Sequence, residues 1–150
     1  IHIHRNPIEV YLSTRHFFSK MMPHLQLQSI DKKTLDDHII QLYKDLMQDY
    51  MIQRELIPKG NLVEVSFDEL EKDPLTIIAS IYKDLDLPAY DLAEPHFIDY
   101  VNKMKSYKKN THVISLDLIN KIEAEWGFAM KNWNYDIPDH IKISKDEKQA

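Results

Sequence analysis

The chain has 150 residues, of which 43% are hydrophobic and 29% charged, the composition of an ordinary globular domain. Its formal net charge of −5 at pH 7 argues against a general nucleic-acid-binding domain, because such domains are usually basic. The absence of cysteine excludes disulfides and thiolate metal sites, and no apolar run approaches the ~20 residues that cross a bilayer. The two glycines, Gly60 and Gly127, are too few for a glycine-rich phosphate-binding loop.

The chain opens with the pattern of a strand followed by a helix. Residues 1–5 alternate apolar and polar side chains, as a β-strand does. Asn6 and Pro7 then supply a helix cap and a proline at the first helical position. Side chains recur at helical spacing up to Pro23, which is expected to end this helix: Val10, Ser13, Phe17 and Met21. Because a domain rarely starts inside a strand, we expect further chain upstream of Ile1.

The rest of the chain is predicted to contain four more helices and one more strand. Polar loops are expected at residues 24–33 and 106–115, and residues 62–67 have the pattern of a strand with Phe67 on its apolar face. Helices are expected at residues 34–55, after Asp73-Pro74, from Glu94-Pro95 to about residue 105, and after Ser115. The polar tail from Asp136 is expected to fray.

Two parallel strands joined through helices predict an α/β fold. Parallel strands need a long crossover connection and are normally buried on both faces, so this pair is expected to belong to a larger sheet. We therefore predict that residues 1–150 form one partial domain, with residues 136–150 as a polar tail. The aromatic side chains of the last helix and its exit are most simply core anchors: Trp126, Trp133 and Tyr135.

The junction after the first strand suits a bound anion. The start of a helix presents backbone N–H groups and a partial positive charge. Arg5 adds a planar guanidinium that can grip phosphate oxygens through two hydrogen bonds. Ser13 lies two turns along the same helix, on the face of Asn6, so its hydroxyl is placed to donate to the same group. The alternative is that Arg5 pairs with a neighbouring acid and Ser13 is buried against a backbone carbonyl.

Several segments together resemble the sulfotransferase family. The string IHRNPIEVYLS at residues 3–13 closely resembles the family's second nucleotide-binding segment, in which an arginine and a serine eight residues later hold a 3′-phosphate. Residues 65–74 (VSFDELEKDP) and 81–88 (IYKDLDLP) resemble later family segments in the same order. Residues 106–110 (SYKKN) resemble the carboxy-terminal segment of bacterial-type members. The resemblance extends over residues 1–135.

The resemblance implies a P-loop-type three-layer α/β fold, present here as a helix-rich partial domain. It implies an enzyme that transfers a sulfuryl group from 3′-phosphoadenosine 5′-phosphosulfate (PAPS) to an acceptor hydroxyl or amine, releasing 3′-phosphoadenosine 5′-phosphate (PAP). Arg5 and Ser13 would bind this nucleotide, and Lys108 and Lys109 would close over it from the carboxy-terminal loop. The alternative for the two lysines is a solvated loop face, and no metal site is implied.

The chain also departs from the family pattern. It lacks the loop with Lys, Gly and Ser or Thr that binds the phosphosulfate, and the family's general base also precedes the segment that matches Arg5. Both are therefore expected upstream of Ile1, and the 150 residues alone are expected to bind nucleotide without turning it over. Phe67 stands where cytosolic members often have a tyrosine near the adenine, and their arginine-lysine-glycine triplet is absent.

Other interpretations remain open at this point. The chain could be a non-catalytic interaction module derived from this fold, or part of a nucleotide kinase. His2 and His4 point to one face of the first strand, where packing or hydrogen bonding is favoured over a metal site because no third ligand is evident. The lack of cysteine and of a membrane span favours a cytoplasmic location. The sequence indicates neither the acceptor, nor the catalytic base, nor the oligomeric state.

Overall fold

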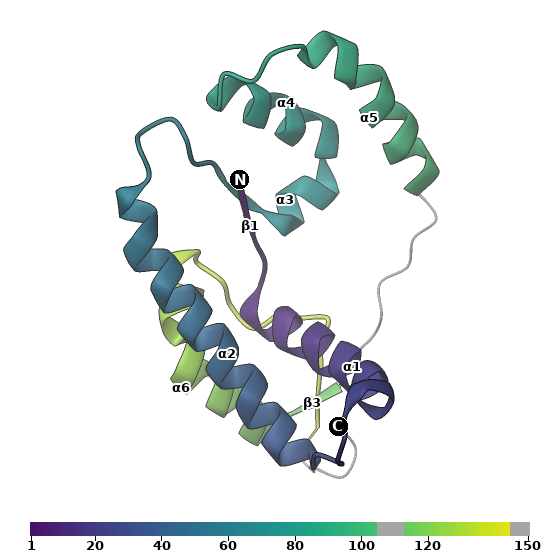
Figure 1. Ribbon diagram of the computed structural model, residues 1–150, viewed down its shortest axis with the longest axis vertical. Helices are drawn as coiled ribbons and strands as arrows, with labels where there is room; N and C mark the ends of the chain where they lie inside the picture. The colour runs from purple at the N-terminus through teal and green to yellow at the C-terminus, as the bar shows by residue number, and fades with distance from the viewer. Residues whose placement is uncertain (105–112, 145–150) are drawn as a thin grey trace. The chain divides into compact units, whose positions relative to one another are not determined.

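The computed structural model describes residues 1–104 and 113–144, and within them it contains seven helices and four short strands (Figure 1). The helices are α1 (Pro7–Leu25), α2 (Lys32–Gln53), the 3₁₀ helix η1 (Arg54–Leu56), α3 (Phe67–Lys72), α4 (Pro74–Asp84), α5 (Tyr90–Met104) and α6 (Leu116–Asn132). The strands are β1 (His2–His4), β2 (Glu64–Ser66), β3 (Val113–Ser115) and β4 (Lys142–Ser144). β1 pairs with β2 and β3 with β4, both in parallel, which confirms the predicted helix-rich α/β class.

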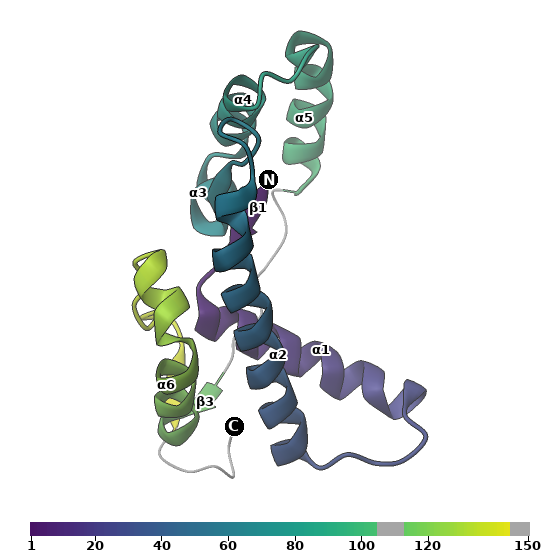
Figure 2. The ribbon, with the colours of Figure 1, turned by 60° about the vertical axis from the view of Figure 1, so that its left-hand side comes forward.

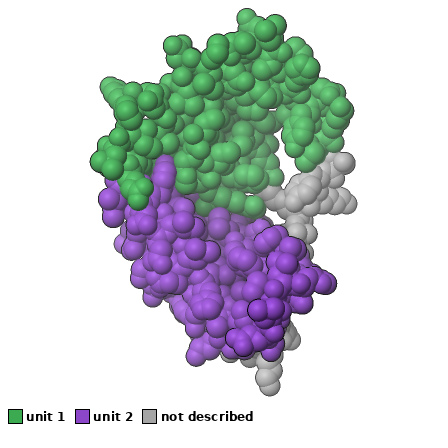
Figure 3. All heavy atoms as spheres, in the orientation of Figure 1, with its two compact units in different colours: residues 1–5, 53–110 green, residues 6–52, 111–150 purple. Residues whose placement is uncertain are grey.

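The chain divides into two compact units (Figure 3). Unit 1 contains Ile1–Arg5 and Gln53–Asn110, and unit 2 contains Asn6–Ile52 and Thr111–Ala150. Each unit has its own pair of parallel strands. Within the described residues of both units, no helix is long and apolar enough to cross a membrane.

Unit 1 combines the predicted parallel strand pair with the short helix η1 and the helices α3, α4 and α5. Ile3 of β1 is in register with Val65 of β2, which is buried. The predicted start of α4 is confirmed, because the Asp73 carboxylate accepts a hydrogen bond from the Thr76 backbone N–H at 3.3 Å. α4 and α5 then pack through the Tyr82 ring, which contacts two aromatic rings edge-on: Tyr90 at 5.2 Å and Phe97 at 6.0 Å between centroids.

Unit 2 contains three long helices, α1, α2 and α6 (Figure 2), and they pack around a single indole ring. Trp126 of α6 is fully buried, and its indole N–H donates to the Ile40 carbonyl of α2 at 2.8 Å. The same ring packs against Tyr43 of α2 and Tyr11 of α1, with centroids 4.0 Å and 6.0 Å away. Trp126 therefore joins all three helices, and its predicted role as a core anchor is confirmed.

Three predicted element boundaries are wrong. Pro23 does not end α1, which continues to Leu25, because a proline in the last turn removes only one helical hydrogen bond. α5 begins at Tyr90, one turn before the expected start, because the Ala89 carbonyl accepts the first helical hydrogen bonds. Phe67 is not part of the second strand, since β2 ends at Ser66 and Phe67 is the first residue of α3.

The β3–β4 pair was missed in the sequence. Val113–Ser115 was expected to belong to a polar loop and residues 142–144 to a fraying tail, yet the two segments pair in parallel. Ile114 is fully buried and Ile141 is nearly so, which ties both segments to the core of unit 2. Strands of three residues carry too little alternation to be recognised as a pattern. The predicted cap of α6 is confirmed, because the Ser115 hydroxyl accepts from the Leu118 N–H at 3.4 Å.

The Trp126 contact predicts a specific loss of stability. Trp126→Phe removes a buried hydrogen bond and part of the ring volume, so we expect the free energy of unfolding to fall by about 2–3 kcal/mol. Trp133→Phe is the matched control, because this indole is only half-buried and stacks on Tyr50 at 6.4 Å, so a loss below about 1 kcal/mol is expected. Urea unfolding followed by circular dichroism measures both. Equal losses would contradict a central role for Trp126.

The histidines of β1 predict a pH dependence of the β1–β2 pairing. Burial lowers the pKa of His2 and of His4 from the ordinary 6.5. The unfolded chain therefore binds more protons than the folded one as the pH falls below about 6.5, so the pairing is most stable above that pH and weakens below it. Carboxylates with lowered pKa, such as Asp37, titrate below 3.8 and do not contribute in this window.

Amide exchange measured at pH about 7.5 and about 5.5 tests this dependence. We expect the protection factors of β1 and β2 amides to fall on acidification, and to fall less in a His2→Gln/His4→Gln variant. Protection that rises on acidification, or an unchanged pH dependence in the variant, would contradict the assignment.

Candidate functional site

Arg5 and Phe67 lie together at the carboxyl edge of the β1–β2 pair. They directly follow His4 and Ser66, which are register partners in the two parallel strands. The Arg5 guanidinium carbon lies 4.6 Å from the centroid of the Phe67 ring, a cation–π contact. In open α/β sheets, ligands bind beyond the carboxyl ends of the strands. A half-buried guanidinium is therefore held at the edge where an anionic ligand is expected.

The two histidines of β1 lie behind this edge and are suited to packing. Their rings lie 6.4 Å apart with an angle of 25° between the planes. Burial lowers the pKa of both imidazoles and outweighs the nearby Glu64 carboxylate, which raises it. The neutral imidazoles therefore dominate at pH 7. Glu64 itself pairs with Arg54 at 3.2 Å. In residues 1–104 and 113–144, no group of three or more His, Asp or Glu side chains is arranged to hold a metal ion.

Ser13 lies on α1 in unit 2 with its side chain exposed. This position excludes the alternative of a serine buried against a backbone carbonyl. Arg5 belongs to unit 1 and Ser13 to unit 2, so each residue is described within its own unit. Their joint binding of one phosphate stays a prediction. Lys108 and Lys109 lie outside the described residues, and their role also stays a prediction.

The start of α1 is held by contacts within unit 2. The Asn6 side chain is buried, and its Oδ1 accepts from the Ile8 N–H at 3.0 Å while its Nδ2 donates to the Asp136 carbonyl at 2.7 Å. Pro7 has no N–H, and the nearly buried Glu9 carboxylate lies 2.9 Å from His140 Nε2. The Asn6 cap and Pro7 together leave few backbone N–H donors free at the start of α1.

The contribution of residues 136–141 to this junction could not be seen in the sequence. Their polar composition favoured a fraying tail, whereas the Asp136 carbonyl and the His140 ring both reach the first turn of α1. A hydrogen bond to a backbone carbonyl cannot be predicted from residue types, because every residue has such a carbonyl. The sequence does not show that Glu9 is buried either, and it is this burial that makes its carboxylate need a cationic or polar partner.

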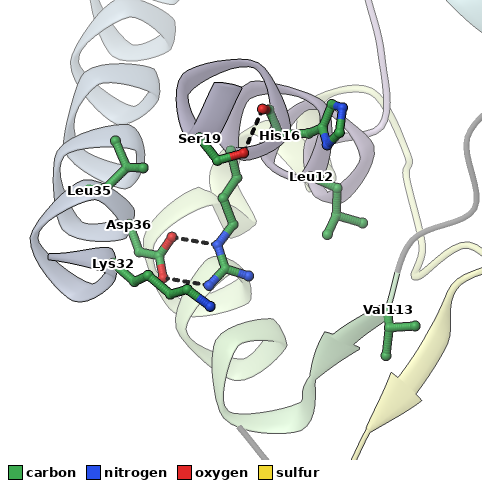
Figure 4. Close-up of a pocket in the computed structure, with 8 residues that line it drawn as sticks. Leu12, His16, Ser19, Lys32, Leu35, Asp36 and Val113 are labelled. Carbon is green, nitrogen blue, oxygen red and sulfur yellow. Dashed lines mark hydrogen bonds and ion pairs between the residues drawn. The ribbon is translucent and has the colours of Figure 1, made fainter. Parts of the chain in front are cut away.

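A cavity of about 240 Å³ lies in unit 2 among α1, α2 and β3 (Figure 4). Its central feature is a two-pronged ion pair, with Arg15 Nε 2.8 Å from Asp36 Oδ1 and Nη2 3.2 Å from Oδ2. Burial, together with the neighbouring Asp36, raises the pKa of the Tyr11 hydroxyl far above its usual range, so Tyr11 stays protonated. Ligand pockets usually exceed about 300 Å³. Because Arg15 and Asp36 satisfy each other at its centre, this cavity is better explained as part of the unit's packing.

The double role of Asn6 predicts the effect of its removal. Asn6→Ala loses both the cap and the bond to the Asp136 carbonyl, so we expect a loss of about 2 kcal/mol in the free energy of unfolding. Asn6→Asp keeps an acceptor for the cap and loses the donor, so about half of that loss is expected. Asp73→Ala is the matched control, because it removes a cap alone, at about 1 kcal/mol. Urea unfolding measures all three, and equal losses for Asn6→Ala and Asp73→Ala would show that the Asp136 bond adds nothing.

Comparison with known proteins places the chain in a family. Residues 1–91 match a family model described as the sulfotransferase family. Over 136 residues the chain is 27% identical to omega-hydroxy-beta-dihydromenaquinone-9 sulfotransferase Stf3 of Mycobacterium bovis (strain ATCC BAA-935 / AF2122/97), and equally to the protein of that name from Mycobacterium tuberculosis (strain CDC 1551 / Oshkosh). The alignment covers 91% of this chain and 35% of each relative, so the chain spans about a third of the length of these curated relatives.

No solved structure matches the chain significantly. The family model, in contrast, covers more than half of the 150 residues and includes both Arg5 and Ser13. The resemblance of residues 3–13 to sulfotransferases therefore agrees, at the level of the family, with an independent comparison. The chain belongs to the sulfotransferase family.

Proposed function

We propose that the chain supplies the 3′-phosphate contacts of a sulfotransferase that uses PAPS, through Arg5 and Ser13. The observation that carries the proposal is the position of Arg5 beyond the carboxyl ends of two parallel strands, with its guanidinium against the Phe67 ring. Family membership over residues 1–91 supports it, because this stretch includes both residues. Lys108 and Lys109 are proposed as further contacts to the same nucleotide.

Each residue has a distinct part in this proposal. The Arg5 guanidinium donates two parallel hydrogen bonds to phosphate oxygens, and the Phe67 ring beneath it limits the orientations that the guanidinium plane can take. The exposed Ser13 hydroxyl donates one more hydrogen bond. The recognition is therefore specific for a phosphate at the 3′ position, and a nucleotide without it loses these contacts.

Binding the 3′-phosphate matters for the transfer because it sets the position of the donor's other end. The sulfuryl group leaves PAPS when its bond to the 5′-phosphate oxygen breaks and a bond to the acceptor atom forms, and PAP is released. Such a reaction depends on holding donor and acceptor in line. Arg5 and Ser13 contribute to that alignment, and the groups that activate the acceptor are proposed to lie outside these 150 residues.

The acceptor class is proposed from the relatives. Their name specifies an omega-hydroxy-beta-dihydromenaquinone-9, so the acceptor group of those proteins is a hydroxyl. We infer that the protein to which this chain contributes also transfers the sulfuryl group to a hydroxyl, on a compound with a large apolar part.

Calorimetric titration with PAP, adenosine 5′-monophosphate and ATP tests the nucleotide proposal. We expect PAP to bind more tightly than the monophosphate. Arg5→Ala should weaken PAP binding by about 10- to 100-fold, because a charge-assisted contact is lost, and leave monophosphate binding unchanged. Ser13→Ala should weaken PAP binding by a smaller factor.

Two matched controls separate these effects from general changes in charge and polarity. Lys83→Ala removes an exposed positive charge from unit 1, and Ser19→Ala removes an exposed hydroxyl from α1. Neither should change PAP binding. Preference for ATP would favour the nucleotide-kinase alternative, and equal binding of PAP and monophosphate would favour a non-catalytic interaction module.

A further inference from the structure

The second half of α1 carries an apolar stripe that unit 2 does not bury. The buried face of this helix consists of Ile8, Tyr11 and Leu12, all in its first two turns. Farther along, the exposed apolar side chains lie four residues apart and so follow one side of the helix: Phe17, Met21 and Leu25. The spacing of Val10, Ser13, Phe17 and Met21 in the sequence therefore marks an outward face rather than the core.

The connection to α2 continues this apolar surface. Leu27 is fully exposed and Ile30 is also exposed. In Figure 2 the second half of α1 and its connection to α2 project beyond the rest of unit 2. Scattered single apolar side chains are normal on a protein surface, but five within fourteen residues at a projecting end indicate a surface that is covered by something else.

The charges around this surface favour one kind of partner. Residues 17–33 contain three lysines and one aspartate, although the whole chain has a net charge of −5. Lys20, Lys32 and Lys33 are exposed and, within the part of the chain that the structure describes, have no ion-pair partner. Asp31 is engaged in capping α2, where its carboxylate accepts from the Thr34 N–H at 2.9 Å. Lys32 and Lys33 also line a hollow of unit 2 with Asp36 and Asp37, and the Lys33 charge helps to lower the pKa of Asp37. Apolar side chains bordered by exposed cations complement an apolar surface that is bordered by anions.

We propose that this surface docks on an anionic phospholipid bilayer. It is called the apolar tip below and consists of Phe17, Met21, Leu25, Leu27 and Ile30 with Lys20, Lys32 and Lys33. The apolar side chains enter the boundary between headgroups and acyl chains, and the lysines extend to the lipid phosphates. A second copy of the chain fits less well, because a two-fold contact through this surface brings the same lysines against each other.

The apolar tip is separate from the proposed nucleotide contacts. It shares no residue with Arg5, Phe67 or Ser13, and α1 itself is fixed at its start by Asn6. Phe17 lies one helical turn from Ser13, but the substitutions that test docking are farther along the chain, at residues 25–33. Vesicle binding is measured without nucleotide, so failure of docking and failure of the proposed function are distinguishable.

Sedimentation with lipid vesicles tests the proposal. We expect the chain to bind vesicles of mixed phosphatidylglycerol and phosphatidylcholine, and to bind pure phosphatidylcholine much less. Leu25→Ser/Leu27→Ser should weaken binding to the mixed vesicles by about tenfold or more, since two large apolar side chains are lost. Lys32→Glu/Lys33→Glu should weaken binding to the mixed vesicles only, and added salt should act in the same direction.

Matched controls are available on exposed positions of unit 1. Leu92→Ser removes an exposed leucine of α5 and Lys83→Glu reverses an exposed lysine of α4, and neither should change vesicle binding. All positions are on the surface, so circular dichroism and PAP titration should be unchanged in every variant. Failure of the unaltered chain to bind anionic vesicles, or binding that survives Leu25→Ser/Leu27→Ser, would overturn the proposal. A dimer that the same double substitution converts to a monomer would assign the surface to a second copy and overturn it as well.

Discussion

Unit 2 depends on the hydrogen bond from the Trp126 indole to the Ile40 carbonyl. This bond is buried, where hydrogen bonds are stronger and an unpaired indole N–H would be costly, so it fixes the rotation of α6 against α2. The same ring packs on Tyr11, which fixes α1. Asn6 then ties the first turn of α1 to the Asp136 carbonyl. The helix that carries Ser13 is thus positioned by side chains and backbone from the opposite end of the chain.

The elements that the sequence predicted correctly are those with local causes. Asp73 and Ser115 each cap a helix through a hydrogen bond to an N–H three residues later, and Asn6 does so over two residues. Such contacts depend only on neighbouring residue types. The β3–β4 pair could not be predicted in this way, because its strands are short and meet only after α6 has folded back. The start of α5 was missed because it depends on Ala89, whose positive φ of 64° is unusual for a residue with a side chain.

The same distinction applies to the candidate site. Arg5 could be recognised because a guanidinium at the end of a strand and the start of a helix has a chemical reason to be there. Its contact with Phe67 could not, because that contact requires the parallel register of β1 and β2 and the end of β2 at Ser66. The sequence placed Phe67 on the apolar face of a strand. As the first residue of α3, it instead presents its ring to the Arg5 guanidinium.

α1 has different chemistry at its two ends, and this difference links the two proposals. Its first turns are capped, buried and tied to Asp136, whereas its last turns are apolar, exposed and bordered by lysines. A helix rises about 1.5 Å per residue, so Leu25 lies roughly 18 Å along the axis from Ser13. Phe17, the first apolar residue of the stripe, lies only about 6 Å along the axis from Ser13, so a bilayer that contacts the whole stripe comes within about one helical turn of Ser13.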